Sequence, residues 1–123
     1  MGRARRQGGL LTANAYCPSR GDIVWLSFAS STGHEQAGQR PALVVSPEPY
    51  NRKVGLALVC PITSREKGYP FEVILPAGLK ASGVVLSDQL KSVDWRARGS
   101  RFLCRVPDAV TAEALDKLAA LLG

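Results

Sequence analysis

The chain has 123 residues, of which 46% are hydrophobic and 21% are charged, and it carries a formal net charge of +6 with a pI near 9.7. These values predict a single folded domain with an anionic partner, either nucleic acid or an acidic polypeptide. No apolar stretch approaches the length that a bilayer requires, so we expect no membrane association.

Three cysteines lie far apart in the sequence, at Cys17, Cys60 and Cys104. An odd number without Cys-x-x-Cys spacing argues against a disulfide framework, and with His34 as the only histidine a zinc site is not expected. We therefore expect reduced thiols in a cytoplasmic protein that holds no metal.

A basic stretch opens the chain. Residues 1–15 contain Arg3, Arg5 and Arg6 but no continuous apolar segment, which argues against a secretory signal. We expect a flexible basic N-terminal arm over residues 1–15, followed by one domain over residues 16–123.

Short apolar runs bounded by Gly, Pro, Asn and Ser then recur along the chain and predict strands. Weak alternation within 42–45 and 56–59 is typical of strands covered on both faces. Six short strands with Pro- and Gly-rich connections, one of them a turn over 47–51, favour a small curled β-sheet or barrel. The expected strands are Asp22–Phe28, Pro41–Ser46, Val54–Ile62, Phe71–Leu75, Val84–Val93 and Ser100–Arg105.

The C-terminal residues change from strand to helix periodicity. Thr111 is a plausible N-cap, and Glu113 in the first turn suits the helix dipole. Leu115, Leu118 and Leu122 then recur on one face. We expect one amphipathic helix that covers the open side of the sheet, with any remaining apolar edge available to a dimer.

Two motifs carry candidate chemistry. In the first, Glu35 to Pro41, the proline pushes Arg40 towards an extended conformation at the mouth of a strand. A guanidinium held there is a permanently charged, five-donor fork suited to a phosphate. The second motif, Pro61 to Ser64, offers hydroxyls at the end of another strand.

Glu35-Gln36-x-Gly38-x-Arg40-Pro41 and Pro61-x-Thr63-Ser64, in this order, resemble the MazF/PemK family of bacterial toxin ribonucleases. The resemblance extends from about Tyr16 to the C-terminus and includes Lys67–Val73, Ser82–Leu86 and Asp88–Arg98. It implies an SH3-like β-barrel with a C-terminal helix, assembled as a homodimer. It also implies metal-independent, sequence-specific cleavage of single-stranded RNA, without a cofactor, and neutralisation by an acidic antitoxin whose flexible tail fills the RNA groove.

The resemblance makes Arg40 and Thr63 the catalytic pair. Metal-free cleavage uses the ribose 2′-OH as nucleophile and leaves a 2′,3′-cyclic phosphate and a 5′-OH. One histidine per chain excludes a mechanism with two histidines from one subunit. Arg40 suits stabilisation of the phosphorane better than proton abstraction, because a guanidinium hardly deprotonates. Glu35 is the nearest carboxylate that can accept a proton or anchor Arg40.

Further polar, basic and aromatic positions are candidates for RNA binding. The basic stretch from Lys91 to Arg101 could track phosphates while Trp95 stacks or packs, and the equal alternative is a solvated basic turn around a buried Trp95. The other candidates also have plain structural alternatives, namely Arg40 paired with Glu35, Thr63-Ser64 as a strand-end turn, and Asp88-Gln89 as solvent-facing strand positions. Of Tyr69 and Phe71, one is expected to pack inward while the other stacks on a base. The candidates are Ser64, Gln36, Lys67, Tyr69, Phe71, Asp88, Gln89, Lys91, Arg96 and Arg98.

Two other functions remain open at this point. A toxin of the same fold that binds DNA gyrase without catalysis would not need Arg40 beside Thr63. An inactive barrel that only binds nucleic acid is the second alternative, since one architecture hosts many functions.

Overall fold

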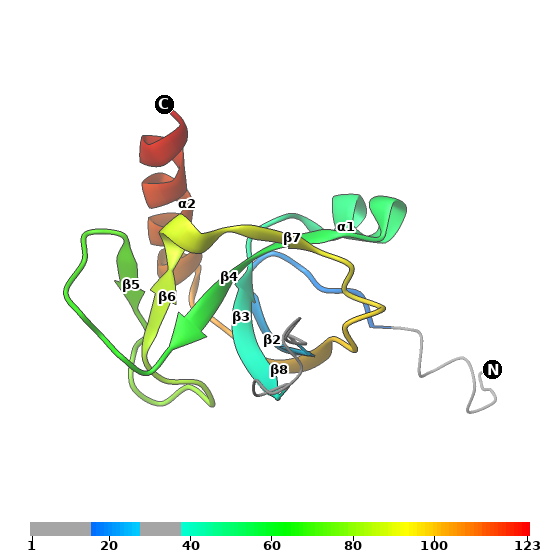
Figure 1. The fold of residues 1–123 in the computed structure, drawn as a ribbon, viewed down its shortest axis with the longest axis horizontal. Helices are drawn as coiled ribbons and strands as arrows, with labels where there is room; N and C mark the ends of the chain where they lie inside the picture. Colours follow the sequence, from blue (N-terminus) through cyan, green and yellow to red (C-terminus); the bar gives the residue numbers. More distant parts are fainter. Residues whose placement is uncertain (1–15, 28–37) are drawn as a thin grey trace, which may run out of the picture.

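The structure is a computed structural model that describes residues 16–27 and 38–123. Seven strands, two α-helices and one 3₁₀ turn succeed one another in this part of the chain (Figure 1). They are β2 (Asp22–Ser27), β3 (Gln39–Val44), α1 (Glu48–Val54), β4 (Ala57–Thr63), β5 (Glu72–Ile74), β6 (Val84–Leu86), η2 (Ser87–Gln89), β7 (Lys91–Val93), β8 (Arg101–Arg105) and α2 (Asp108–Leu122).

The strands form one curled antiparallel sheet in the order β5-β6-β4-β3-β2-β8, with β7 also paired to β4. Strand β4 is the centre of this arrangement. One side of β4 pairs with β3, while the other pairs first with β7, through Ala57 and Val93, and then with β6, through Thr63 and Val84. The mainly β fold with a C-terminal helix that the sequence predicts is confirmed.

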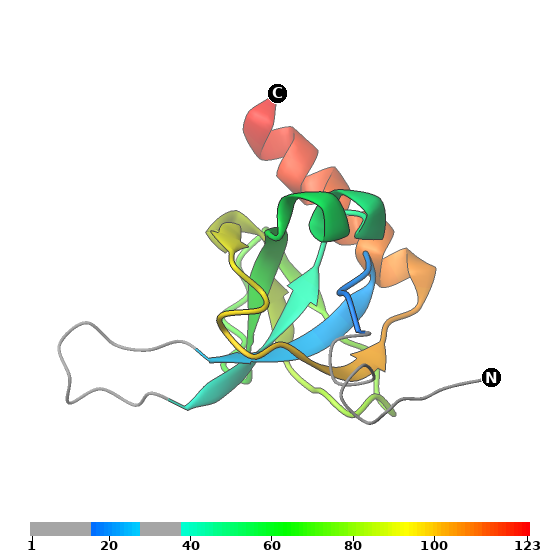
Figure 2. The same cartoon turned by 90° about the vertical axis from the view of Figure 1, so that its right-hand side faces the viewer.

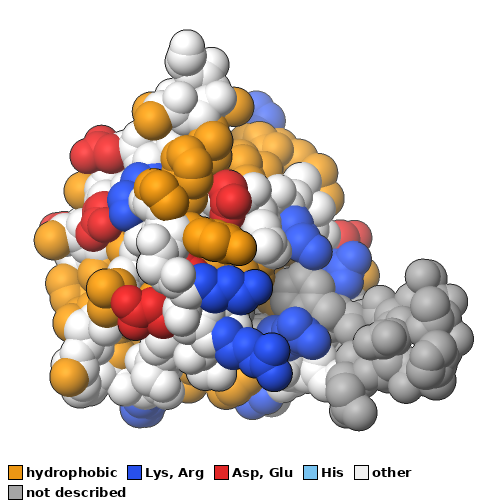
Figure 3. Space-filling view, turned by 60° about the vertical axis from the view of Figure 1, so that its left-hand side comes forward, with side chains coloured by type: hydrophobic (Ala, Val, Ile, Leu, Met, Phe, Trp, Pro, Cys, Tyr) orange, Lys and Arg blue, Asp and Glu red, His pale blue; other side chains and the backbone are white. Residues whose placement is uncertain are grey.

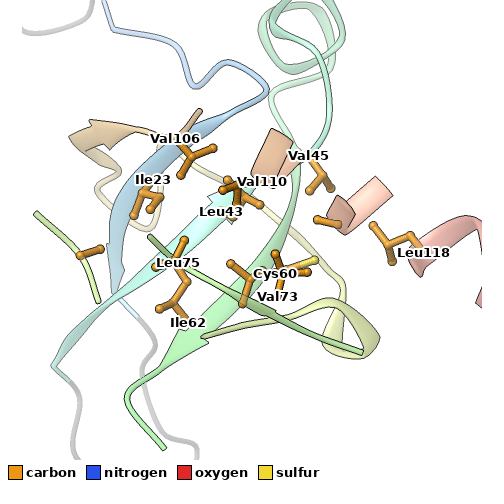
Figure 4. Close-up of a cluster of buried hydrophobic side chains, with 13 residues drawn as sticks. Ile23, Leu43, Val45, Cys60, Ile62, Val73, Leu75, Val106, Val110 and Leu118 are labelled. Atoms are coloured by element: carbon orange, nitrogen blue, oxygen red, sulfur yellow. The ribbon is translucent and has the colours of Figure 1, made fainter. Parts of the chain in front are cut away.

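One face of the sheet packs against α2. Alternate residues of the strands, such as Ile23, Leu43 and Cys60, point into this cluster (Figure 4). Val110 and Leu118 close it from the helix. This is the covering role expected of the C-terminal helix.

The opposite face carries a second buried cluster. The intervening strand residues Val24, Ala42 and Val59 pack there with Cys17 and Trp95. Two-sided burial explains the weak alternation of residues 42–45, because both sets of alternate residues are apolar.

Residues 47–51 are not the expected turn but the beginning of helix α1. Pro47 is its N-cap, and Pro49 lies in its first turn, where a missing backbone N–H has no helical partner to lose. Gly55 ends the helix in a left-handed conformation, with φ of 81°, and donates its N–H to the carbonyl of Asn51.

The N-cap of α2 is Pro107, four residues before the expected cap Thr111, and the helix begins at Asp108. Thr111 is instead buried within the first turns. Leu118 packs into the core, whereas Leu122 is 82% exposed, so the last turn of the helix extends beyond the sheet. Figure 2 shows both helices above the sheet and the beginning of β3 at its lower edge. Within the described ranges, no helix has the length and apolar character needed to cross a membrane.

Two predicted strands differ in extent. The expected run Val84–Val93 is divided into β6 and β7 by the 3₁₀ turn η2. This division lies where the pairing along β4 changes from β7 to β6. Val54 belongs to α1, so β4 begins only at Ala57.

Candidate functional site

Arg40 and Thr63 lie at the same edge of the sheet. Arg40 is the second residue of β3 and Thr63 the last of β4. The register between these strands pairs Leu43 with Cys60 and Ala42 with Pro61. This pairing ends at Ala42 and Pro61, so Arg40 and Thr63 each lie two residues beyond it, at the same end of the two antiparallel strands. In Figure 1 the beginning of β3 and the end of β4 both lie at the lower edge of the sheet.

The two residues also share a face. Ala42 and Val59 belong to the cluster that contains Trp95, and side chains alternate along a strand. Arg40 is two residues from Ala42, and Thr63 is four from Val59, so both fall on that face. Arg40 is exposed and Thr63 half-buried, so the pair lies where the apolar cluster ends.

More cations gather at this edge. The Arg98 guanidinium donates to the carbonyl of Ser27 at 3.0 Å, and Ser27 is the register partner of Gln39. Arg101 donates to the Gln39 side chain. Figure 3 shows a face of the molecule on which Lys and Arg side chains gather beside hydrophobic ones. The arrangement favours a polyanion lying across the edge.

A backbone contact fixes the end of β4. The Thr63 hydroxyl accepts the N–H of Arg65 at 3.2 Å, so the expected strand-end turn is present. Gly83, with φ of 111°, lies against this turn, where a Cβ would come 2.1 Å from the Thr63 carbonyl oxygen. The sequence motifs do not single out Gly83 as part of the site. Its signal is a glycine directly before the apolar run of β6.

The loop after Ser64 places an aromatic ring on the surface. Tyr69 is 55% exposed, and the Lys67 ammonium lies 5.8 Å from its ring centroid. Phe71 is half-buried and so is the more inward of the two rings, while stacking of Tyr69 on a base stays a prediction. Ser64 is exposed at the start of this loop.

The remaining candidates are distributed along η2, β7 and the loop after it. Asp88 and Gln89 are exposed in η2 rather than in a strand. Lys91 is exposed in β7 and pairs with Val59. Its register position places it on the same face as Arg40 and Thr63.

Trp95 is not available for stacking on RNA. It is buried, and its indole N–H donates to the carbonyl of Asn51 in α1 at 3.0 Å. The Arg96 guanidinium lies 4.7 Å from the indole ring. Arg96 is therefore positioned by Trp95 beside α1 and not by the strand ends that carry Arg40 and Thr63.

Glu35, Gln36 and His34 lie outside the described residues. Among the cysteines, burial raises the pKa of the Cys60 thiol to about 12, with a smaller contribution from the charge of Asp88. Cys60 faces the α2 side of the sheet, opposite to Thr63. A thiol that stays protonated on the other face supplies no nucleophile to the site.

Residues 19–122 match a family model described as the PemK-like, MazF-like toxin of type II toxin–antitoxin systems. The endoribonuclease toxin MazF of Escherichia coli K12 is 53% identical over 85 residues, which are 69% of this chain and 76% of that protein. The endoribonuclease PemK of E. coli is 40% identical over 109 residues, covering 84% and 80% of the two chains. A MazE–MazF crystal structure from Deinococcus radiodurans superposes with a TM-score of 0.85 at 56% identity, covering 88% of this chain and 97% of the other.

Proposed function

Because the chain belongs to the PemK-like, MazF-like family of type II toxins, we propose that it is a toxin endoribonuclease. It cleaves single-stranded RNA at specific sequences, without a metal ion or cofactor, and thereby inhibits translation and growth. We expect it to act in the cytoplasm, where messenger RNA is translated.

The observation that carries this proposal is the juxtaposition of Arg40 and Thr63. They come from different strands and are 23 residues apart in the sequence, yet each lies two residues beyond the last register pair of β3 and β4, at one edge of the sheet. A toxin that acts by binding gyrase alone does not require a guanidinium and a hydroxyl at one position.

The chemistry follows from these two groups. The ribose 2′-OH attacks the adjacent phosphorus, and the bond to the 5′ oxygen of the next nucleotide breaks. Arg40 donates two parallel hydrogen bonds to the phosphate, and these strengthen as negative charge develops in the phosphorane. Thr63, with Ser64 beside it, holds a non-bridging oxygen or orients the 2′-OH. Glu35 is proposed to accept the proton of the 2′-OH or to hold Arg40 in place.

The surroundings of the pair form the proposed RNA-binding surface. Lys67 and Lys91 contact phosphates, while Tyr69 stacks on a base. Arg98 extends the cationic edge of the sheet. Arg96, which lies beside α1, contacts the RNA beyond that edge. Asp88, Gln89 and Phe71 border this surface, and Gln36 is proposed to contact RNA as well.

A second part of the proposal concerns protein partners. The D. radiodurans structure contains MazE together with MazF, and we propose that a MazE-like acidic antitoxin occupies the RNA groove of this chain. The net charge of +6 favours such a partner.

We further propose a homodimer. An apolar groove runs beside the C-terminal half of α2, and Leu122, which lines it, is 82% exposed. Tyr50 and Leu90 line the same groove and are also exposed. A second copy would cover this surface. Sedimentation of a monomer at micromolar concentration would contradict the dimer while leaving the nuclease proposal intact.

The test of the nuclease is incubation of the purified protein with a long single-stranded RNA in EDTA. Wild type and Arg52→Ala are expected to release discrete fragments with 5′-OH ends, whereas Arg40→Ala leaves the RNA intact. Arg52 is a matched control because it is an exposed arginine on α1, at the other end of β3 from Arg40. Equal cleavage by Arg40→Ala and wild type would contradict the proposal.

A further inference from the structure

A buried carboxylate lies under the loop that follows Thr63. Glu72, the first residue of β5, is 7% exposed. Its carboxylate accepts the backbone N–H of Lys67, at 3.0 Å from Oε2, and that of Gly68, at 2.9 Å from Oε1. A carboxylate that receives amide N–H groups in a buried setting makes charge-assisted hydrogen bonds, which are among the stronger ones in proteins.

These bonds fold the loop into one shape. Gly68 has φ of 82°, and the N–H of Glu72 donates to the carbonyl of Tyr69 at 3.1 Å, so the chain turns back around the carboxylate. Lys67 and Tyr69 are held on either side of Gly68, with the ammonium over the ring. The exposed groups of the loop are thus tied to a buried acceptor.

The backbone of the same residues is fixed from the other side. The Lys117 ammonium on α2 donates to the carbonyl of Glu72 at 2.8 Å. The N–H of Ser87 donates to the carbonyl of Phe71 at 3.1 Å. Glu72 therefore connects a rigid frame, made of β5, η2 and α2, to the loop that carries the exposed aromatic ring.

We propose that Glu72 is a positioning residue that holds Lys67 and Tyr69 in the arrangement in which they bind RNA beside the scissile phosphate. The proposal rests on the proposed nuclease function for its RNA part. Glu72 itself touches no substrate, because its carboxylate is buried under the loop and engaged by two backbone amides.

The decisive variant is Glu72→Gln, which keeps the shape of the side chain and removes its charge. The amide group of glutamine places an N–H₂ against a backbone N–H, so at most one of its two ends remains an acceptor. Glu66→Gln is the matched control, because Glu66 is exposed in the same loop and the change of charge is identical.

Two measurements are made on each protein. The first is amide hydrogen exchange at Lys67 and Gly68, which reports their hydrogen bonds to the Glu72 carboxylate in the absence of RNA. The second is steady-state cleavage of an oligonucleotide with one cleavage site, in wild-type and Tyr69→Ala backgrounds. A double-mutant cycle separates positioning of Tyr69 from general damage to the fold.

If Glu72 positions the loop, both amides are protected in wild type and in Glu66→Gln and exchange faster in Glu72→Gln. KM rises by roughly tenfold in Glu72→Gln with kcat nearly unchanged, a factor that corresponds to about 1.4 kcal/mol of binding. Tyr69→Ala then adds little further loss in the Glu72→Gln background.

Three results would overturn the proposal. They are unprotected amides in wild type, a wild-type KM for Glu72→Gln, and full additivity of the Glu72 and Tyr69 effects. The first of these is decisive even if Glu72→Gln does not fold, because it needs only the wild-type protein. Failure of the wild-type protein to cleave any RNA would instead contradict the nuclease proposal. The exchange data would still report whether Glu72 holds the amides of Lys67 and Gly68.

Discussion

The α-carbon of Gly83 lies directly against the carbonyl of Thr63, so close that a Cβ would come 2.1 Å from that oxygen and 3.0 Å from the α-carbon of Ser64. The obstructing atoms are backbone atoms of the neighbouring strand, which cannot turn aside as a flexible side chain does. Gly83 thereby determines where β4 ends and where its last hydroxyl lies.

Gly83→Ala is therefore expected to displace Thr63 and to abolish cleavage while also lowering the free energy of unfolding. Gly78→Ala is the matched control, because Gly78 has a similar φ of 95° but nothing within 4 Å of the position that a Cβ would occupy. The control is expected to lose only about 1–3 kcal/mol, the cost of a non-glycine residue in that backbone region, and to retain activity. Urea unfolding and RNA cleavage measure the two effects. Equal losses in both variants would contradict a role for the contact with Thr63.

Arg40→Lys tests whether the fork of the guanidinium is needed or only its charge. Lysine keeps one positive charge but cannot make two parallel hydrogen bonds to one phosphate. We expect the rate constant to fall by about 10²–10³, the cost of losing a donor to a developing oxyanion. Single-turnover cleavage at saturating enzyme measures this rate constant. Arg52→Lys should match wild type, and full activity of Arg40→Lys would reduce the proposed role to a simple cation.

Thr63→Val replaces the hydroxyl with a methyl group of similar size. The strand should persist, since valine suits β-structure, but the group that contacts the phosphate or the 2′-OH is lost. We expect cleavage at least tenfold slower, equivalent to about 1.4 kcal/mol, with the unfolding midpoint lowered only by the loss of the hydrogen bond from the Arg65 N–H. Thr63→Ser, which keeps the hydroxyl, should recover most of the rate. Equal rates for the valine and serine variants would exclude a chemical role for the hydroxyl.

Lys67→Ala is expected to change the salt dependence of RNA binding more than the rate of cleavage. Each phosphate contact with a single strand contributes a slope of about 0.7 to the decrease of log affinity with log salt concentration. In a fluorescence titration across salt concentrations, the slope for the variant should be smaller by about 0.7, the contribution of one phosphate contact. Lys53→Ala, an exposed lysine on α1, serves as the control. An unchanged slope would mean that Lys67 contacts no phosphate.

Stability is expected to fall at high pH because of Cys60. Burial raises the pKa of this thiol to about 12 from its ordinary 9.0. Above pH 9 the unfolded chain loses the proton that the folded chain retains, so stability is full below pH 9 and is lost as the pH rises towards 12. Urea unfolding at pH 8 and pH 10.5 should show a smaller decrease for Cys60→Ala than for wild type. Parallel decreases would exclude this thiol as a cause.

Some elements can be predicted from local sequence and others cannot. The strands around Ile23, Leu43 and Cys60 follow from apolar runs bounded by turn residues. The sequence around Pro47 and Pro49 predicts a turn in place of helix α1, because proline interrupts a helix in its interior. Proline is nevertheless tolerated at the N-cap and in the first turn of a helix, which is where these two residues lie. The interruption of the run 84–93 falls on the polar residues Ser87-Asp88-Gln89, and it coincides with the change of partner along β4.

The candidate site divides in the same way. Motifs identify Arg40 and Thr63 as candidates, but that both lie at the same edge of the sheet depends on the pairing of β3 with β4, which no motif encodes. Gly83 and Glu72 escape identification from the sequence because each acts on backbone atoms of another segment. Trp95 illustrates the limit of composition, since a tryptophan within a basic stretch is equally typical of a stacking platform and of a core residue.

The arrangement of β4 also has a consequence for the order in which the chain becomes active during synthesis. Arg40 and Thr63 are made early, but the strand that ends at Thr63 is flanked on one side by β6 and β7, which emerge about twenty to thirty residues later. The glycine that fixes its end precedes β6. A nascent chain truncated before these strands has an unpaired β4 and no α2 to close the core, and domains generally fold as units. A chain still under synthesis therefore lacks the complete fold around Thr63 until β6, β7 and α2 have been made.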